Sequence, residues 1–386
     1  MSLRPGSAES ARGLLHSAAV TGQRDLRTVW AACERTLSRF ATGEIAAKAA
    51  LRALADWTPN EAEIDRYGKG GLASGLEDRI AALLGKEAAV WLPSGTMAQQ
   101  IALRIHADRS NRRTVAFHPQ CHLDAHEERG YEALHGLRGI LVGSRDRLIA
   151  TADVEAVREP FAALLLELPQ RDLGGQLPEW DDLVATCEVA RSRGAALHLD
   201  GARLWQCPPF YGRPLDEIAA LFDTVYVSLY KDIGAPAGCV LAGPGELIDE
   251  VRVWQLRHGG RMFSVYPLLL AAERGLDEVL PRMAAYVERA REVGRMLANL
   301  DGLTVVPDPP QTAMLHVLAR RPYEALCEAT LDLSEASGVW FAGEWRETAD
   351  PTTQRLELSL GETSFGVSVE EARTLWSELL ARTAPA

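Results

Sequence analysis

Two short, mostly apolar segments near the middle of the chain constrain its fold more than any other feature. Residues 195–199 and 224–228 have the length and composition of buried strands in a parallel sheet. Asp200 directly follows the first segment, and Lys231 lies shortly after the second. Because ligands bind at the carboxyl ends of strands in open α/β sheets, we expect this carboxylate and this amine to reach the same crevice.

A lysine and a carboxylate at one edge of a sheet suit pyridoxal phosphate in particular. This cofactor needs a lysine that binds it as a Schiff base, and a carboxylate that keeps its pyridine nitrogen protonated so that the ring accepts electrons. Gly234 and Gly238 follow Lys231 and allow the backbone to approach a ligand closely. The alternative for each residue alone is structural, with Asp200 as a helix N-cap and Lys231 as a solvated surface lysine.

A strand, a tight turn and a helix predicted over residues 88–107 provide a site for a phosphate group. Ser94, Gly95 and Thr96 form the turn, which places two hydroxyl groups and free backbone N–H groups at the start of the helix. Helix N-termini bind anions through these N–H groups and the helix dipole. The alternative is that Ser94 or Thr96 simply caps the helix.

Three histidines and a glutamate follow the strand predicted at 114–117: His118, His122, His126 and Glu127. These residue types are compatible with a metal site, but their spacing matches no firm ligand pattern, so we predict no metal. At a strand end that faces a crevice, a histidine can stack on a flat cofactor or act as an acid or base. The alternative for any one of them is a structural hydrogen bond.

Strands and helices alternate to about residue 245, which predicts an α/β fold with a large, doubly wound, mostly parallel sheet. A long, mostly helical stretch then leads into a smaller α+β unit. We therefore expect an N-terminal helical arm over 1–58, a large α/β domain over 59–275 and a small C-terminal α+β domain over 276–386. Strands of the small domain are predicted near 303–306, 314–318, 339–341 and 355–360, with helices near 322–337 and 368–382.

Charge and composition exclude several classes of protein. The chain of 386 residues has a net charge of −12 and no dominant basic segment, which argues against nucleic acids and anionic membranes as partners. No apolar run approaches the roughly 20 residues needed to span a bilayer, and the first residues lack the apolar region of a signal peptide. The six cysteines are scattered without metal-binding spacing, as expected of buried thiols in a cytoplasmic protein.

Four segments together resemble the threonine aldolase and β-eliminating lyase family, which belongs to the fold-type I group of pyridoxal phosphate enzymes. The resemblance covers about residues 67–272, and the combination of segments in this order is specific. The segments are a glycine-rich turn with a phosphate loop (67–103, including LPSGTMAQQ), HLDAHE (122–127), LHLDGARLW (197–205) and SLYKDIGAPAGCVLAG (228–243).

The resemblance implies how the chain holds its cofactor, pyridoxal 5'-phosphate. Lys231 would bind it as a Schiff base, and Asp200 would pair with the pyridinium nitrogen. Gly95 and Thr96, with Ser94, would hold the phosphate at the start of the helix.

The resemblance also implies roles toward an amino-acid substrate. His122 would stack on the cofactor ring and transfer protons. Arg203 would bind the substrate carboxylate, and Arg355 in the C-terminal lobe resembles a second arginine of this kind. Glu127 matches a glutamate near the histidine. Independently of the resemblance, Tyr67 lies on a glycine-rich loop, where it is either a ligand contact or a plain turn aromatic.

The implied reaction is cleavage of a β-hydroxy-α-amino acid, of the threonine or allo-threonine type, to glycine and an aldehyde. The nearest alternatives use the same cofactor for β-elimination or for amino transfer on another amino acid. An alternative of another class is a non-catalytic binding protein on the same fold. The resemblance further implies a homodimer or homotetramer. The general base, the aldehyde and the stereochemistry at Cβ stay open at this point.

Overall fold

The computed structural model describes residues 26–38 and 47–384, which form two compact units. The larger unit is Lys48–Val287. The smaller unit combines Glu288–Ala386 with Met1–Ala47, so far as these ranges are described.

These boundaries differ from the predicted ones at residues 58 and 275. The predicted N-terminal arm is divided, because α1 (Leu26–Ala32) packs against α14 (Tyr323–Ser337) of the smaller unit. In contrast, α2 (Ala47–Trp57) lies almost wholly within the larger unit. The remainder of the arm, residues 1–25 and 39–46, lies outside the described residues.

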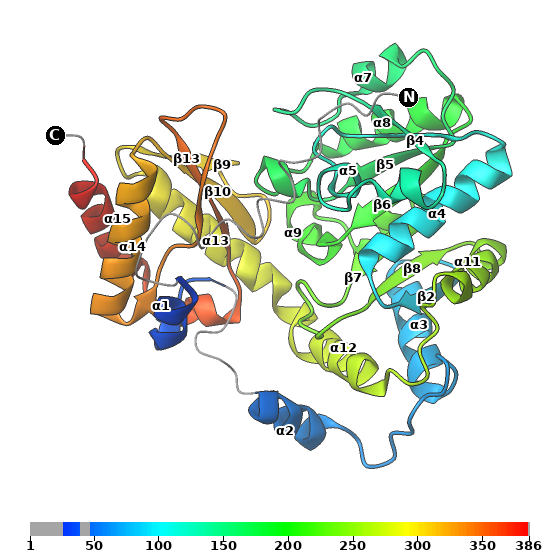
Figure 1. Cartoon of the computed structure of the whole chain (residues 1–386), viewed down its shortest axis with the longest axis horizontal. Coiled ribbons are helices and arrows are strands. Elements are labelled where there is room, and N and C mark those ends of the chain that lie inside the picture. The colour runs from blue at the N-terminus through cyan, green and yellow to red at the C-terminus, as the bar shows by residue number, and fades with distance from the viewer. Residues whose placement is uncertain (1–25, 39–46, 385–386) are drawn as a thin grey trace. The chain divides into compact units, whose positions relative to one another are not determined.

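A seven-stranded sheet forms the centre of the larger unit (Figure 1). Its strands are β2 (Ala88–Leu92), β3 (Thr114–Phe117), β4 (Arg138–Leu141), β5 (Ala163–Glu167), β6 (Ala196–Gly201), β7 (Thr224–Ser228) and β8 (Cys239–Gly243). Their order is β2-β8-β7-β6-β5-β3-β4, and only the two pairings of β8 are antiparallel. The central strands are buried almost throughout, which explains their continuous apolar runs.

Helices cover both faces of this sheet, as the predicted doubly wound fold requires (Figure 1). On one face, α4 (Gly95–Ser110) packs against α11 (Gly245–Arg257). On the other, α3 (Gly71–Leu83) contacts β2 and β8, and α8 (Trp180–Ser192) contacts β6. Two further long helices, α12 (Tyr266–Glu278) and α13 (Met283–Ala298), follow α11 in the chain. The shorter helices are α5 (His122–Ala125), α6 (Gly130–Ala133), α7 (Thr151–Ala156), α9 (Pro208–Tyr211) and α10 (Leu215–Ala219).

The antiparallel direction of β8 follows from its short connection to β7. Residues 229–238, which join β7 to β8, contain no helix, and a parallel strand needs a longer crossover connection. The chain therefore turns back on itself, so that Val225 of β7 pairs with Ala242 of β8. Lys231 lies within this returning loop.

The smaller unit contains a four-stranded antiparallel sheet covered by helices α14 and α15 (Val369–Arg382). Its order is β12-β13-β10-β9, and the strands are β9 (Leu303–Val306), β10 (Met314–Ala319), β12 (Trp345–Glu347) and β13 (Gln354–Ser359). A separate parallel pair joins β1 (Arg35–Thr36) to β11 (Val339–Trp340). Prediction missed β12, since three residues carry no periodic signal and only the pairing with β13 defines the strand.

In the parts of the chain that the structure describes, no helix combines the length and the hydropathy needed to cross a membrane.

Candidate active site

Asp200 lies at the carboxyl end of β6 and is only 4% exposed. Gln99 of α4 donates from Nε2 to its Oδ2 at 2.7 Å, and the backbone N–H of Ala202 donates to Oδ1 at 3.0 Å. The two donors fix the orientation of the carboxylate at the edge of the sheet. Asp200 is therefore a buried strand-end acid and does not cap a helix.

The residues that follow Asp200 hold the loop that carries Lys231. Trp205 donates from Nε1 to the carbonyl oxygen of Ser228 at 3.0 Å, and the backbone N–H of Lys231 donates to Ser228 Oγ at 3.3 Å. Gln206 donates from Nε2 to Asp232 Oδ1 at 2.8 Å. One sequence motif thus carries the carboxylate and also positions the amine.

The amine of Lys231 is buried near several charged side chains, both acidic and basic. Burial lowers its pKa below the usual value, and the positive charge of Arg203 acts in the same direction. The carboxyl groups of Asp200 and Glu167 oppose this effect. A lowered pKa increases the fraction of neutral amine, which is the form that attacks a carbonyl group. The structure therefore brings Lys231, Asp200 and Arg203 to the same strand edge.

The start of α4 follows β2 at this edge. Ser94 is the N-cap, and its side chain accepts from the backbone N–H of Met97 at 3.3 Å, so the capping alternative holds for this residue. The backbone N–H groups of Gly95 and Thr96 have no acceptor within residues 26–38 and 47–384, and Thr96 is exposed. A Cβ at Gly95 would lie 2.2 Å from the hydroxyl oxygen of Tyr226, so only glycine fits here. This helix start can accept an anion.

His122 is the histidine of this segment that pairs with Glu127. Its ring Nδ1 lies 3.0 Å from Oε1 of Glu127, and its side chain is 32% exposed. Glu127 itself is buried, and Gln100 donates from Nε2 to its other oxygen at 3.4 Å. With Nδ1 donating to the carboxylate, Nε2 carries the lone pair. Glu127, predicted to bind substrate, thus has both oxygens within reach of protein donors.

The other two histidines of this segment have structural partners. His118 is buried, and its Nε2 lies 2.8 Å from the carbonyl oxygen of Ser144, while Gln120 donates its backbone N–H to Nδ1 at 3.0 Å. His126 pairs with Asp172 at 3.0 Å. Within the described ranges, no three His, Cys, Asp or Glu side chains form a group that could hold a metal ion.

Two further residues were predicted as substrate contacts, Tyr67 in the larger unit and Arg355 in the smaller one. Tyr67 is 53% exposed, has a positive φ of 53°, and packs edge-on against Phe263. No hydrogen bond or ring contact within the described residues joins Tyr67 to Lys231 or His122. Arg355 is a half-buried residue of β13 in the smaller unit.

Two residues of the site were missed from the sequence. Gln99 lies one helical turn after Gly95, so it faces the same way as the helix start, and this spacing was a usable signal. Glu167 ends β5 and is the registered neighbour of Asp200 on β6. Its position at a strand end carries the same signal that identified Asp200.

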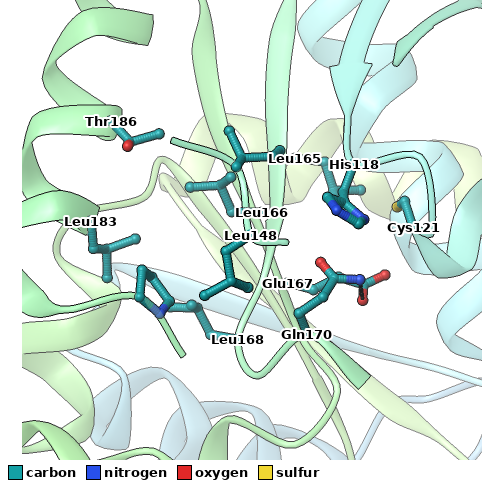
Figure 2. Close-up of a pocket in the computed structure, with 12 residues that line it drawn as sticks. His118, Cys121, Leu148, Leu165, Leu166, Glu167, Leu168, Gln170, Leu183 and Thr186 are labelled. Atoms are coloured by element: carbon teal, nitrogen blue, oxygen red, sulfur yellow. Dashed lines mark hydrogen bonds between the residues drawn. The ribbon is translucent and has the colours of Figure 1, made fainter. Parts of the chain in front are cut away.

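A small, mostly aliphatic pocket adjoins the carboxyl ends of β3 and β5 (Figure 2). Leu166, Leu168 and Leu183 line one part of it. Glu167 and Gln170 lie side by side at another part, near His118 and Cys121 (Figure 2).

The side chains at this strand edge fit pyridoxal phosphate. Lys231 offers an amine to its carbonyl carbon, and Asp200 offers a carboxylate to its ring nitrogen. The N–H groups of Gly95 and Thr96 suit its phosphate. His122 presents a partly exposed imidazole that can lie against a flat ring.

Comparison with known proteins agrees with this arrangement. Low-specificity L-threonine aldolase 1 of Arabidopsis thaliana is 28% identical over 267 residues, which are 66% of this chain and 74% of that protein. The low specificity L-threonine aldolase of Escherichia coli (strain K12) is 32% identical over 250 residues, 61% of this chain and 74% of that protein.

A solved structure from Listeria monocytogenes EGD-E, provisionally described as an L-allo-threonine aldolase, matches with a TM-score of 0.88 and 35% sequence identity. The match covers 92% of this chain and 98% of that chain. Such coverage confirms the fold class predicted from the resemblance. A family model described as beta-eliminating lyase matches residues 40–320, well over half of the sequence. The chain therefore belongs to the beta-eliminating lyase family.

Proposed function

We propose that the chain is a pyridoxal phosphate-dependent aldolase that cleaves a β-hydroxy-α-amino acid of the threonine type to glycine and an aldehyde. The observation that carries the proposal is geometric: Trp205 and Gln206, which follow Asp200, hold the loop of Lys231 through hydrogen bonds to Ser228 and Asp232. The names of similar proteins, L-threonine aldolases from a plant and a bacterium, support the substrate class.

The proposed cofactor site uses residues from three elements. Lys231 holds the cofactor covalently, and Asp200 keeps a proton on its ring nitrogen. Gly95 and Thr96 bind its phosphate at the start of α4. When bound, pyridoxal phosphate accepts the electron pair that is released as the Cα–Cβ bond breaks.

The remaining residues act on the substrate. Arg203 binds the substrate carboxylate through two parallel hydrogen bonds, which fixes the direction of the Cα–Cβ bond. His122 accepts the proton of the β-hydroxyl group at Nε2, because its Nδ1 donates to Glu127. Glu127 then acts by orienting His122 and stabilising its positive charge. Tyr67 and Arg355 remain predicted substrate contacts.

We also infer that the protein is a cytoplasmic homo-oligomer. Exposed apolar side chains gather where two segments meet, since the backbone N–H of Tyr67 donates to the carbonyl oxygen of Phe263 at 2.7 Å and the two rings pack together. Met262 and Tyr266 beside them are also exposed. Such a cluster is typical of a subunit interface. A monomer in light scattering would contradict this inference.

The cytoplasmic location is inferred from the cysteines. All six cysteines are unpaired, which supports a reducing compartment.

The visible absorption spectrum of the purified protein, supplied with pyridoxal phosphate, tests the proposed function. We expect a band from the lysine-bound cofactor, a new band at longer wavelength after addition of glycine, and equal amounts of glycine and acetaldehyde from L-threonine. Lys231→Ala should lose the band and the turnover, whereas Lys48→Ala, an exposed lysine of α2, should keep both.

Other outcomes point to the alternatives. Ammonia and a keto acid would indicate β-elimination, and a reaction that requires an amino acceptor would indicate transamination. The absence of any band after incubation with the cofactor would favour a non-catalytic binding protein.

A further inference from the structure

Glu167 is a buried acid that has no role in the reaction proposed above. It ends β5 in the middle of the sheet, and only 8% of its surface is exposed. Its Oε1 accepts the backbone N–H of His122 at 2.6 Å, although the two residues are 45 positions apart. The carboxyl group therefore joins the end of one strand to the loop that follows another.

Gln170 holds the second oxygen of this carboxyl group. Its Nε2 donates to Glu167 Oε2 at 2.6 Å and lies 3.3 Å from the carbonyl oxygen of Gln120 (Figure 2). Gln170 is itself fixed, because its backbone N–H donates to Gln176 and its carbonyl oxygen accepts from Gly175. Glu167 is thus clamped between a rigid turn and the backbone of His122.

His122 is consequently held at two points by two different carboxyl groups. Glu127 orients its ring through Nδ1, and Glu167 fixes its backbone. We propose that Glu167 is a positioning residue of the aldolase reaction, which sets the place of the His122 imidazole by holding the His122 backbone N–H. This inference rests on the function proposed above, in which the His122 ring accepts the proton of the substrate.

The neighbours of Glu167 indicate that it works as a neutral acid. Burial and the adjacent carboxylate of Asp200 raise its pKa to about 8, and Asp172 acts in the same direction. The backbone N–H of His122 and the amine of Lys231 oppose this shift. A neutral Glu167 adds no second negative charge beside Asp200, its registered neighbour on β6.

The experiment compares Glu167→Gln with Glu167→Ala in the protein loaded with pyridoxal phosphate. A glutamine oxygen still accepts the His122 N–H, and the Gln170 amide must turn so that its oxygen accepts from the new NH2 group. We expect kcat for L-threonine to stay within about threefold of wild type. Alanine removes the acceptor, so kcat should fall at least tenfold with a smaller change in KM, while the visible band of the lysine-bound cofactor persists.

The dependence of kcat/KM on pH provides a second readout. In the wild type, ionisation of Glu167 near pH 8 places a second negative charge beside Asp200 and should lower the rate on the alkaline side, and Glu167→Gln should lack this decline. The matched control is Glu77→Gln, because Glu77 is also buried and accepts a backbone N–H, that of Trp91, at 2.9 Å. That control should keep the wild-type pH profile even if it is less stable.

Three outcomes would overturn the inference: wild-type kcat in Glu167→Ala, a loss in Glu167→Gln as large as in Glu167→Ala, or identical pH profiles for wild type and Glu167→Gln. If Glu167→Ala does not fold, the pH profile of Glu167→Gln decides alone. Failure of the proposed function is distinct, because the wild type itself would then release no glycine from L-threonine.

Discussion

Asp200 shows how the task of one side chain depends on the groups around it. Its carboxylate is buried beside a second acid, Glu167, and Gln99 and the backbone N–H of Ala202 donate to its two oxygens. A negative charge in a buried, preorganised site acts more strongly on a nearby positive charge than it would in water. The charge of Asp200, rather than its shape, is therefore what the proposed reaction uses.

Asp200→Asn tests this point, because it keeps the size of the side chain and removes the charge. We expect kcat for L-threonine to fall on the order of a hundredfold, as is typical when one preorganised electrostatic contact is lost, while some cofactor still binds to Lys231. The control is Asp249→Asn, an exposed carboxylate of α11. Unchanged turnover in Asp200→Asn would show that the ring nitrogen needs no charged partner.

Helix α12 supports the loop that carries Lys231 through an unusually close approach. A Cβ at Gly275 would lie 2.1 Å from the carbonyl oxygen of Ile233, which belongs to the same loop as Lys231. Gly75 in α3 is also a helical glycine, but a Cβ there would meet no atom within 4 Å. Alanine substitutions at the two positions can therefore be compared. Both replace a helical glycine, but only the one at Gly275 creates a steric clash.

We expect opposite effects from the same substitution at these two positions. Gly275→Ala should push α12 away from the Lys231 loop, lower the melting temperature and weaken cofactor binding. Gly75→Ala should raise the free energy of unfolding by about 0.5–1 kcal/mol, because alanine is the better helix former. Thermal melts with and without pyridoxal phosphate measure both. Equal melting temperatures for the two variants would contradict the close approach.

For the molecule as a whole, buried neutral histidines make stability depend on pH. His106 of α4 and His198 of β6 both contact Oγ1 of Thr224, at 2.9 and 2.8 Å. Burial lowers the pKa of His106 to about 4, although Asp223 opposes the shift. Burial, together with His106, lowers the pKa of His198 to about 3. In the unfolded chain both histidines titrate near pH 6.5.

The unfolded state therefore binds more protons than the folded state below pH 6.5. The stabilising contribution is complete above that pH and is lost as the pH falls toward 4 and 3, by on the order of 3 kcal/mol for each histidine at pH 4. Urea unfolding midpoints at a series of pH values measure this loss. His106→Gln should flatten the dependence whatever its effect at pH 7, and a wild-type slope in that variant would contradict the assignment.

Sequence patterns were sufficient to identify Asp200 at the end of one strand and Lys231 just beyond another. Strands of a parallel sheet end at one edge, so the apolar runs of β6 and β7 were enough to bring Asp200 and Lys231 together. The helix start at Ser94 followed from the same local pattern. These features depend on short-range periodicity and on turn residues, which a single chain displays directly.

Two features could be known only from the tertiary structure: β8 runs antiparallel, and Glu167 holds the backbone of His122. These outcomes depend on hydrogen bonds between residues far apart in the chain, such as the 101 positions that separate Gln99 from Asp200. Local patterns set the strands but not their order. The order of the strands and the packing of helices such as α4 on the sheet determine which distant side chains come within hydrogen-bonding distance.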